Sequence, residues 1–399
     1  MTTRKDGWTR TALIAFIAFV GLGLNSGLLG VAWPSMRDQF GLRLDTVGIL
    51  ILVSTVTYAL AGFSIGRLTA HFGAGTILMT GAGLMALCLL GTAIAPAWIL
   101  IILLALISGF GTGLIDAGLN LYVATYHTAQ QMNLLHACFG IGITLGPLIM
   151  TFVLQQKLGW QMGYAIVGLI LIAVTVSFAL TRKLWRIEGI QTSDNAPLIR
   201  ANFAQTIRLP EVWFSLATFL AYVGMELGIG QWAYSLLTDS RKIAPEIAGP
   251  WVAIYWGAFT GGRIFWSVFA NRFQIEKVLR YSMLGAVLGT ALFWWNPVAI
   301  VGFIGLVIVG AAEAPIFPML MASTRERVGA EHTENTISMQ MGFVGIGSGI
   351  VLGLIGTIGA NFGSEMMALA FVVLSVIALS CHELIYIKRK QPVPAIVTD

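Results

Sequence analysis

Four charged residues lie inside the long apolar runs of this sequence, where charge is rare: Asp116, Glu226, Arg263 and Glu313. A charged side chain in hydrocarbon costs about 2.5–3.5 kcal/mol on insertion scales, so each one is a candidate functional residue. A carboxyl group binds a proton or a sodium ion, and it accepts hydrogen bonds from the hydroxyl groups of a solute. These residues therefore predict reversible binding of a small ion or a polar solute.

Asp116 lies in the segment GLIDAGLNLYV, and Asn120 follows it one helical turn later. Residues four apart on a helix share a face, so both side chains are expected to point into one polar cavity. A desolvated carboxyl group there is suited to exchange a proton near neutral pH, and an ionised one to hold sodium together with Asn120. A structural hydrogen bond that ties two helices together is the alternative interpretation.

Glu226 lies in YVGMELGIGQW, between glycines and shortly before Gln231 and Trp232. A carboxylate, an amide and an aromatic ring suit a sugar, because its hydroxyl groups need acceptors and its C–H face packs on a ring. The glycines favour a broken helix at this point, as discontinuous membrane helices have beside binding sites. Trp232 also fits an aromatic belt at the membrane surface.

Glu313 precedes Pro315 and Pro318, which remove backbone donors and predict a kink in their helix. We expect Glu313 either to contact the solute or to pair with Arg263. Arg263 and Arg67 both stand near the predicted inner ends of helices, where they are candidates for cytoplasmic gates.

Asn25, in GLNSGLLGVAW, and His136, in NLLHACFG, are further polar candidates for solute binding. A lone histidine more often has a structural role. The sequence shows no metal-ligand cluster, no nucleophile arrangement and no phosphate-binding loop. We therefore expect a protein that is not an enzyme and holds no metal or cofactor, apart from a coupling ion that is H⁺ or Na⁺.

Membrane-spanning helices are the elements that must position these residues. The chain of 399 residues is 57% hydrophobic and 10% charged, whereas about a quarter of the residues of a soluble domain are charged. Its apolar windows are long enough, at about 20 residues, to cross a hydrocarbon core as helices, and they lack the alternation of a barrel strand. The twelve predicted spans are approximately residues 11–33, 46–69, 75–95, 97–124, 132–155, 162–182, 209–237, 248–271, 276–295, 297–322, 335–360 and 364–387.

Lysine and arginine residues predict the orientation of these spans. With the N-terminus inside, seventeen of the 23 basic residues fall in cytoplasmic segments and five fall outside. Both chain ends are therefore expected in the cytoplasm, in a multi-pass protein of the plasma or inner membrane. The basic pI of about 9.2 thus reflects topology, and no nucleic-acid partner is expected.

A long polar connection divides the chain into two parts. The predicted units are a six-helix half at residues 1–182, a cytoplasmic linker at 183–208 and a second six-helix half at 209–399. The segments GFSIGR, ending at Arg67, and AFTGGR, ending at Arg263, share a small-x-x-x-Gly-Arg pattern 196 residues apart. Applied to Asp116, this offset ends beside Glu313, so the two acids are expected to be near-equivalents in a duplicated chain. The small residues of both segments are expected to let helices approach closely.

Several segments resemble one family of membrane proteins. GLIDAGLNLYV followed by MNLLHACFGIGITLGPLI resembles spans four and five of the fucose permease branch of the major facilitators, which includes fucose, galactose and glucose symporters. YVGMELGIGQW and PIFPML look like parts of spans seven and ten. The resemblance implies the fold of twelve helices in two halves, with the coupling acid at Asp116 and its companion at Asn120. That branch has a second acid in span one, where this chain has Asn25, so Glu226 is expected to carry the second charge.

The sequence therefore predicts an ion-coupled symporter of a small polyhydroxylated solute, a monosaccharide, working by alternating access as a monomer in membrane lipid. Asp116 and Glu226 are the expected ion-coupling residues. The expected solute-binding residues are Asn25, Asn120, His136, Glu226, Gln231, Trp232 and Glu313. A proton-driven exporter of drugs or metabolites is the alternative, because GIGITLGP resembles a span-five motif of drug antiporters. A receptor-like transporter or lipid scramblase is a third hypothesis that no appended domain supports.

Overall fold

The computed structural model describes residues 10–126, 129–185, 203–269 and 272–390, and these ranges are almost entirely helical. The helices of the first part are α1 (Arg10–Phe40), α2 (Val47–Phe72), α3 (Ala74–Ala93), α4 (Trp98–Tyr126), α5 (Ala129–Gln155) and α6 (Trp160–Thr181). Those of the second part are α7 (Phe203–Thr206), α8 (Pro210–Ser235), α9 (Pro245–Phe269), α10 (Ile275–Trp295), α11 (Ala299–Glu313), α12 (Ile316–Ala322), α13 (Thr324–Val328), α14 (Thr333–Phe362) and α15 (Glu365–Lys390). The short elements η1 (Leu44–Thr46), η2 (Arg182–Leu184) and η3 (Leu236–Ser240) complete the described ranges.

Each predicted apolar window falls on one long helix, except that the tenth window falls on α11 and α12 together. Within the described ranges, ten helical stretches are long and apolar enough to cross a membrane. The chain is therefore an all-helical, multi-pass membrane protein. Residues 1–9 and 391–399, and residues 186–202 of the predicted linker, lie outside the described ranges.

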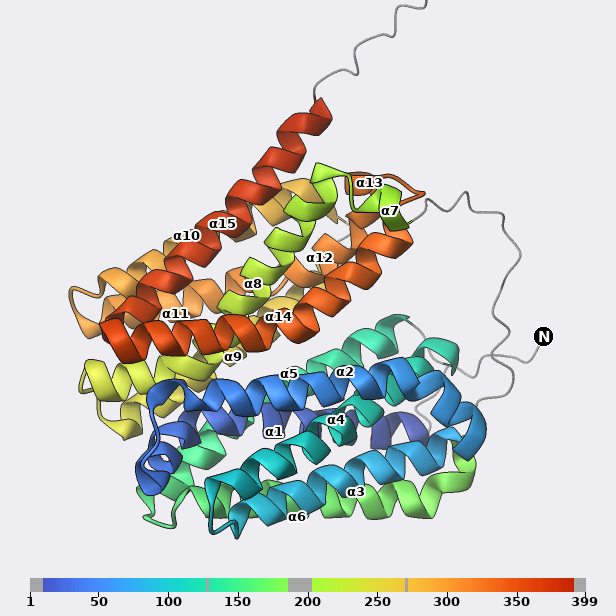
Figure 1. Cartoon of the computed structure of the whole chain (residues 1–399), viewed down its shortest axis with the longest axis vertical. Coiled ribbons are helices and arrows are strands. Elements are labelled where there is room, and N and C mark those ends of the chain that lie inside the picture. The colour runs from blue at the N-terminus through green and yellow to red at the C-terminus, as the bar shows by residue number, and fades with distance from the viewer. Residues whose placement is uncertain (1–9, 127–128, 186–202, 270–271, 391–399) are drawn as a thin grey trace, which may run out of the picture.

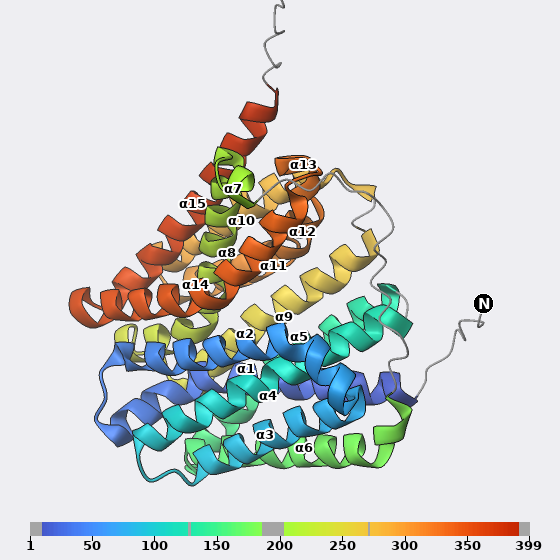
Figure 2. The same ribbon diagram turned by 45° about the vertical axis from the view of Figure 1, so that its right-hand side comes forward.

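The helices gather into two groups that follow the order of the chain (Figure 1). Helices α1 to α6 pack mainly on one another, as do α8 to α15. The groups meet where α5 packs on α9, α2 on α14 and α1 on α8. Figure 2 shows α9 lying along α5 at this boundary. The cavity described below lies between the two groups.

One end of the boundary is closed by direct contacts. Arg37 at the end of α1 donates a hydrogen bond from Nη1 to Asp239 of η3, at 3.0 Å. Nearby, a Cβ at Gly48 of α2 would lie 2.8 Å from the Cα of Gly353 in α14. Backbones this close require glycine, so the two groups are tightly sealed at this end.

The structure tests three sequence predictions about helix breaks and close helix packing. The helix of Glu313 breaks where predicted, because α11 ends at Glu313 and α12 begins after Pro315. The broken helix predicted around Glu226 is wrong, since α8 runs without interruption through its glycines. Close packing at Gly62 and Gly66 is also wrong, because a Cβ at either position would lie more than 4 Å from every atom outside its own stretch of helix in the part of the chain that the structure describes. At Gly262, by contrast, a Cβ would lie 2.6 Å from the Cβ of Ala314.

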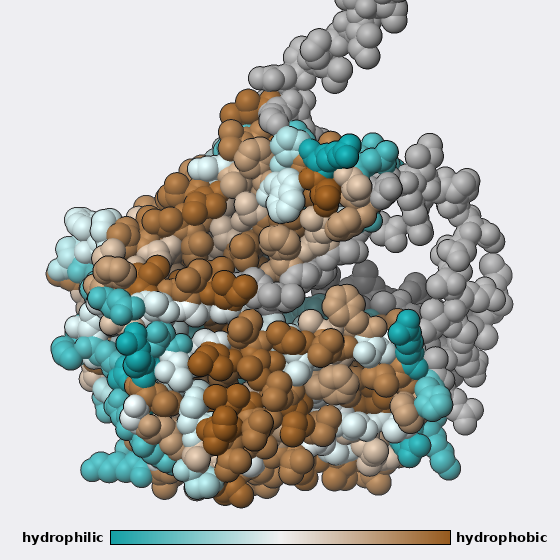
Figure 3. Space-filling view, viewed as in Figure 1, coloured by the Kyte–Doolittle hydropathy of each residue, from teal (hydrophilic) through white to brown (hydrophobic). Residues whose placement is uncertain are grey.

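The surface agrees with a protein surrounded by lipid. In Figure 3, hydrophobic residues cover the broad middle of the face, and hydrophilic residues gather toward its left and right edges. Large apolar side chains such as Phe63 and Leu180 are more than 80% exposed. Such exposure is favourable in hydrocarbon and unfavourable in water, so these side chains belong to the lipid-facing surface.

The crossing of α1 and α5 gives a first testable prediction. A Cβ at Gly142 would lie 2.1 Å from the carbonyl oxygen of Val20, so Gly142→Ala must push the two backbones apart. Overpacking of this kind costs about 1–3 kcal/mol. We expect a lower melting temperature of the detergent-solubilised protein for Gly142→Ala. The control Gly62→Ala, in open space, should melt at or above the wild-type temperature; equal melting of both variants would contradict the packing.

Candidate functional site

A cavity of about 350 Å³ lies between the two helix groups. Its volume is at the lower end of the about 300–1,000 Å³ of pockets that hold drug-sized ligands, which suits a small solute. The polar residues that line it are Asn25, Ser26, Ser54, Thr55, Tyr58, Thr92, Ser108, Thr112, Tyr164, Glu226 and Gln231.

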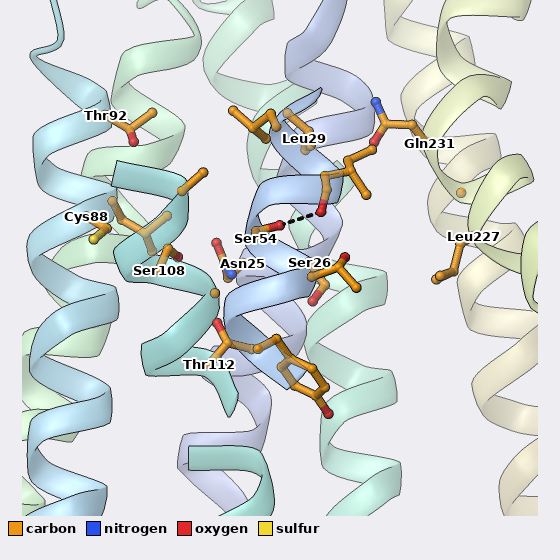
Figure 4. A pocket seen from close by; sticks show the side chains of 18 of the residues that line it. Asn25, Ser26, Leu29, Ser54, Cys88, Thr92, Ser108, Thr112, Leu227 and Gln231 are labelled. Atoms are coloured by element: carbon orange, nitrogen blue, oxygen red, sulfur yellow. Dashed lines mark hydrogen bonds between the residues drawn. The ribbon is translucent and has the colours of Figure 1, made fainter. Parts of the chain in front are cut away.

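The two helix groups contribute different chemistry to this cavity. The first group supplies every hydroxyl side chain of the lining, from α1, α2, α3, α4 and α6. The second group supplies the carboxyl group of Glu226, the amide of Gln231 and the ring of Trp256. Figure 4 shows Ser54, Ser108 and Thr112 on one side, with Gln231 and Leu227 of α8 across from them.

The amide nitrogen of Gln231 is buried and has no hydrogen-bond partner within the described ranges. Its side chain is 7% exposed, and its Nε2 makes no hydrogen bond to any residue that the structure describes. A buried donor without a partner is costly, so this amide is placed to bind a hydrogen-bond acceptor in the cavity.

Asp116 lies beside this cavity rather than in its wall. The hydroxyl of Tyr58, a lining residue on α2, donates a hydrogen bond to Asp116 Oδ2. Asn120 Nδ2 donates to both the backbone oxygen and Oδ1 of Asp116, each at 2.9 Å. The carboxyl group therefore links α2 to α4, as in the structural interpretation, and also reaches the cavity through Tyr58.

Glu226 lines the cavity from α8, and it receives a hydrogen bond on Oε2 from Tyr222 one turn earlier. Tyr222 itself is fully buried. The pairing follows from the sequence, since residues four apart on a helix share a face. One oxygen of this carboxyl group is thus held by the protein at the cavity wall.

Glu313 is completely buried between helices and does not line the cavity. The hydroxyl of Tyr255, on α9, lies 2.7 Å from its Oε2 and 3.0 Å from the backbone oxygen of Glu226. The other oxygen, Oε1, has no hydrogen-bond partner among the described residues. Tyr255 thus joins the two acids of the second group.

Arg263 and His136 interact electrostatically with these acidic residues. The guanidinium of Arg263 interacts electrostatically with Glu226, Glu313 and His136, and it lies 4.3 Å from the ring centre of Phe259. His136, on α5 of the first group, interacts electrostatically with Asp116 as well. The structure thus brings Asp116, His136, Arg263 and both glutamates into one polar cluster across the boundary.

The remaining sequence candidates are placed as follows. Asn25 lines the cavity, and Trp232 does not. Trp232 is fully buried, and its Nε1 donates to the backbone oxygen of Leu352 at 3.2 Å. Arg67 is exposed near the end of α2.

Sequence reasoning did not single out Trp256, Tyr58 or Tyr255. Trp256 is the tryptophan of the cavity wall, and a Cβ at Gly230 would lie 2.2 Å from its ring. The two tyrosines lie 197 residues apart, so the internal repeat is the signal by which they could have been found.

Comparison with known proteins gives several sequence relatives that are named as transporters. The chain is 24% identical to the hexuronate transporter of Bacillus subtilis, over 76% of this chain and 74% of that protein. It is 23% identical to the sodium-dependent glucose transporter 1A of Mus musculus, over 76% and 79%. It is also 20% identical to the glucose/mannose transporter GlcP of Bacillus subtilis, over 87% of both chains. These relatives are transporters and not enzymes.

Solved structures show the same fold. A nucleoside transporter superposes with a TM-score of 0.76 at 15% identity, covering 95% of this chain and 100% of that one. A D-xylose-proton symporter gives a TM-score of 0.74 at 14% identity, with 94% and 97% covered. The family model of the Major Facilitator Superfamily matches residues 15–295 and 214–398. Together with the helical fold and the cavity between two helix groups, this match shows that the chain belongs to the Major Facilitator Superfamily of transporters.

Proposed function

We propose that this transporter carries a small uncharged polyhydroxylated solute, a monosaccharide, in symport with an ion. The observation that carries the proposal is the cavity wall, with hydroxyl groups on one side and Glu226, Gln231 and Trp256 on the other. Hydroxyl groups of a sugar find donors and acceptors on both sides, and its C–H face finds an aromatic ring. The names of the glucose and glucose/mannose relatives support this solute class.

The charges favour an uncharged solute over an acidic one, although one relative is named for hexuronate. A uronate needs a cation for its carboxylate, and Arg263 is the arginine of this cluster. Arg263 already faces Glu226 and Glu313, so a third carboxylate would add repulsion at this place. The exporter alternative is not favoured by the relatives.

Coupling is assigned to Asp116 and Glu226, as follows from their places on opposite sides of the boundary. Glu226 touches the cavity directly, and Asp116 touches it through Tyr58. In this proposal the ion neutralises the cluster, and the loaded carrier rocks between its two conformations more readily than the charged empty one. Arg263 acts within this cluster, and Arg67 is proposed as a gate at the cytoplasmic end of α2.

The proposed carrier is a monomer with twelve spans and both termini in the cytoplasm, in the plasma or inner membrane. Helices α1 to α6 form one rocking half, and α8 to α15 form the other. The contacts at Arg37 and Gly48 hold the halves together at the outer end. Alternating access then requires these outer contacts to open.

Asp116→Asn tests the coupling. The amide preserves the volume and accepts the Tyr58 hydrogen bond, but it cannot carry a proton or a negative charge. In proteoliposomes with imposed proton or sodium gradients and a panel of labelled sugars, we expect the wild type to accumulate one sugar. The variant should lose accumulation against a gradient and keep exchange of labelled for unlabelled sugar. Loss of both, or extrusion of a cationic dye in place of sugar uptake, would refute the proposal.

Gln231→Ala tests the cavity as the solute site. Its amide has no partner among the described side chains, so the solute is its expected acceptor. One hydrogen bond contributes about 0.5–1.5 kcal/mol, which corresponds to a roughly two- to tenfold higher half-saturating sugar concentration. The matched control is Asn361→Ala, exposed near the end of α14, which should leave that concentration unchanged. An unchanged value for Gln231→Ala would place the solute elsewhere.

A further inference from the structure

The two halves contain a matching pair of residues that the internal repeat relates. Tyr58 and Asp116 are hydrogen-bonded across α2 and α4, and Tyr255 and Glu313 are hydrogen-bonded across α9 and α11. The members of each pair are 58 residues apart. Tyr255 follows Tyr58 by 197 residues, and Glu313 follows Asp116 by the same number. The same tyrosine–carboxyl contact is thus built at equivalent places in both halves.

Resting on the symport proposed above, we propose that both pairs are proton-binding sites and that two protons accompany each solute. Glu313 then binds the second proton, and Glu226 acts in coupling as the ionised partner of Arg263 at the cavity wall. The step adds one proton from water to each carboxylate and returns it to water on the other side, so that no electron or further reactant is involved. The second site depends on Glu313, whose side chain is completely buried.

The number of hydrogens available for the two contacts of Tyr255 indicates that Glu313 carries a proton. The hydroxyl of Tyr255 has one hydrogen, but it lies within hydrogen-bond distance of two oxygens. The backbone oxygen of Glu226 only accepts a hydrogen bond, so the tyrosine hydrogen satisfies this oxygen. Glu313 Oε2 then completes the second contact by donating its own proton to the tyrosine oxygen. A protonated Glu313 makes both contacts good hydrogen bonds.

The charges around Glu313 point to the same state. The groups that face it are Tyr255 and Arg263 from α9 and Glu226 from α8. One arginine faces two carboxyl groups, and Glu313 is the fully buried one, with Oε1 unpartnered among the described residues. A buried carboxylate with neither a full partner set nor its own counter-ion is highly unfavourable, so the proton goes to Glu313 and the arginine balances Glu226.

The surroundings of Asp116 favour a proton over sodium at the first site. The groups that face it are Tyr58 from α2, His136 from α5 and Asn120 from α4 itself. Asn120 must turn its nitrogen toward Asp116, because both atoms that it contacts are acceptor oxygens. Its oxygen is therefore turned away, and sodium binding would require the amide to turn over, whereas proton binding would not. A proton needs only the Tyr58–Asp116 contact, which is the same chemistry as at Glu313.

Infrared difference spectroscopy of the reconstituted protein between acid and alkaline pH tests the sites without any solute. Among the protonated-carboxyl bands, we expect one that Asp116→Asn removes and another that Glu313→Gln removes. Tyr255→Phe should shift the Glu313 band alone, and Tyr58→Phe the Asp116 band alone. The control Glu246→Gln, at the exposed start of α9, should keep both bands. Absence of a band that Glu313→Gln removes would overturn the second site, even if sugar transport is confirmed.

The stoichiometry is measured by the sugar ratio that a pH difference of one unit sustains without a membrane potential. Each coupled proton multiplies that ratio about tenfold, so two protons give about 100-fold and one gives about tenfold. We expect the higher ratio for wild type and the lower for Glu313→Gln. A Glu313→Gln ratio equal to wild type would refute the proposal. If the wild type moves no sugar, the symport fails, and the infrared bands still decide whether both carboxyl groups bind protons. Melting temperatures identify a variant that does not fold, in which case Tyr255→Phe carries the test.

Discussion

Carboxyl groups held among helices that lie in hydrocarbon are the constraint on which the rest of this structure depends. Lipid offers no hydrogen bonds, so the protein itself must satisfy every such group. The hydroxyl of tyrosine is a suitable partner, because it donates to a carboxylate and accepts from a protonated carboxyl group. A proton is therefore gained or lost without breaking the contact. The described ranges include this contact at Tyr58 and Asp116, at Tyr222 and Glu226, and at Tyr255 and Glu313.

The packing of the two halves places these contacts around one cavity. Because α9 lies against α5, Arg263 of the second half comes within electrostatic reach of His136 in the first. His136 in turn interacts with Asp116. A rocking motion that changes the contact of α5 with α9 therefore changes the charge that Asp116 experiences. The proposed coupling between ion and solute would use such a shared cluster, because binding at one part alters the energy of the other.

The sequence was most informative about features that depend on the spacing of residues along a single helix. The apolar windows, the Asp116–Asn120 contact and the break after Glu313 all follow from spacing along a single segment. Contacts between helices were missed, because rotation about the helix axis is set by packing. Gln231 and Trp232 are neighbours, but adjacent residues on a helix differ by about 100° in direction, so only Gln231 faces the cavity. Tyr58 was missed for the same reason, although the internal repeat relates it to Tyr255.

The repeat keeps the tyrosine–carboxyl pair but places it in unlike surroundings. Asp116 lies in the continuous helix α4, beside a hydroxyl-rich wall, whereas Glu313 ends α11 next to a proline break. The break lets the chain bring Glu313 under Tyr255, away from the cavity, while the uninterrupted α8 keeps Glu226 at its wall. In the cavity wall, the first half thus contributes hydroxyl groups, and the second contributes the carboxyl group of Glu226. An exchange of the acids between halves would therefore not be neutral, because burial and counter-ions differ although the sequence spacing is the same.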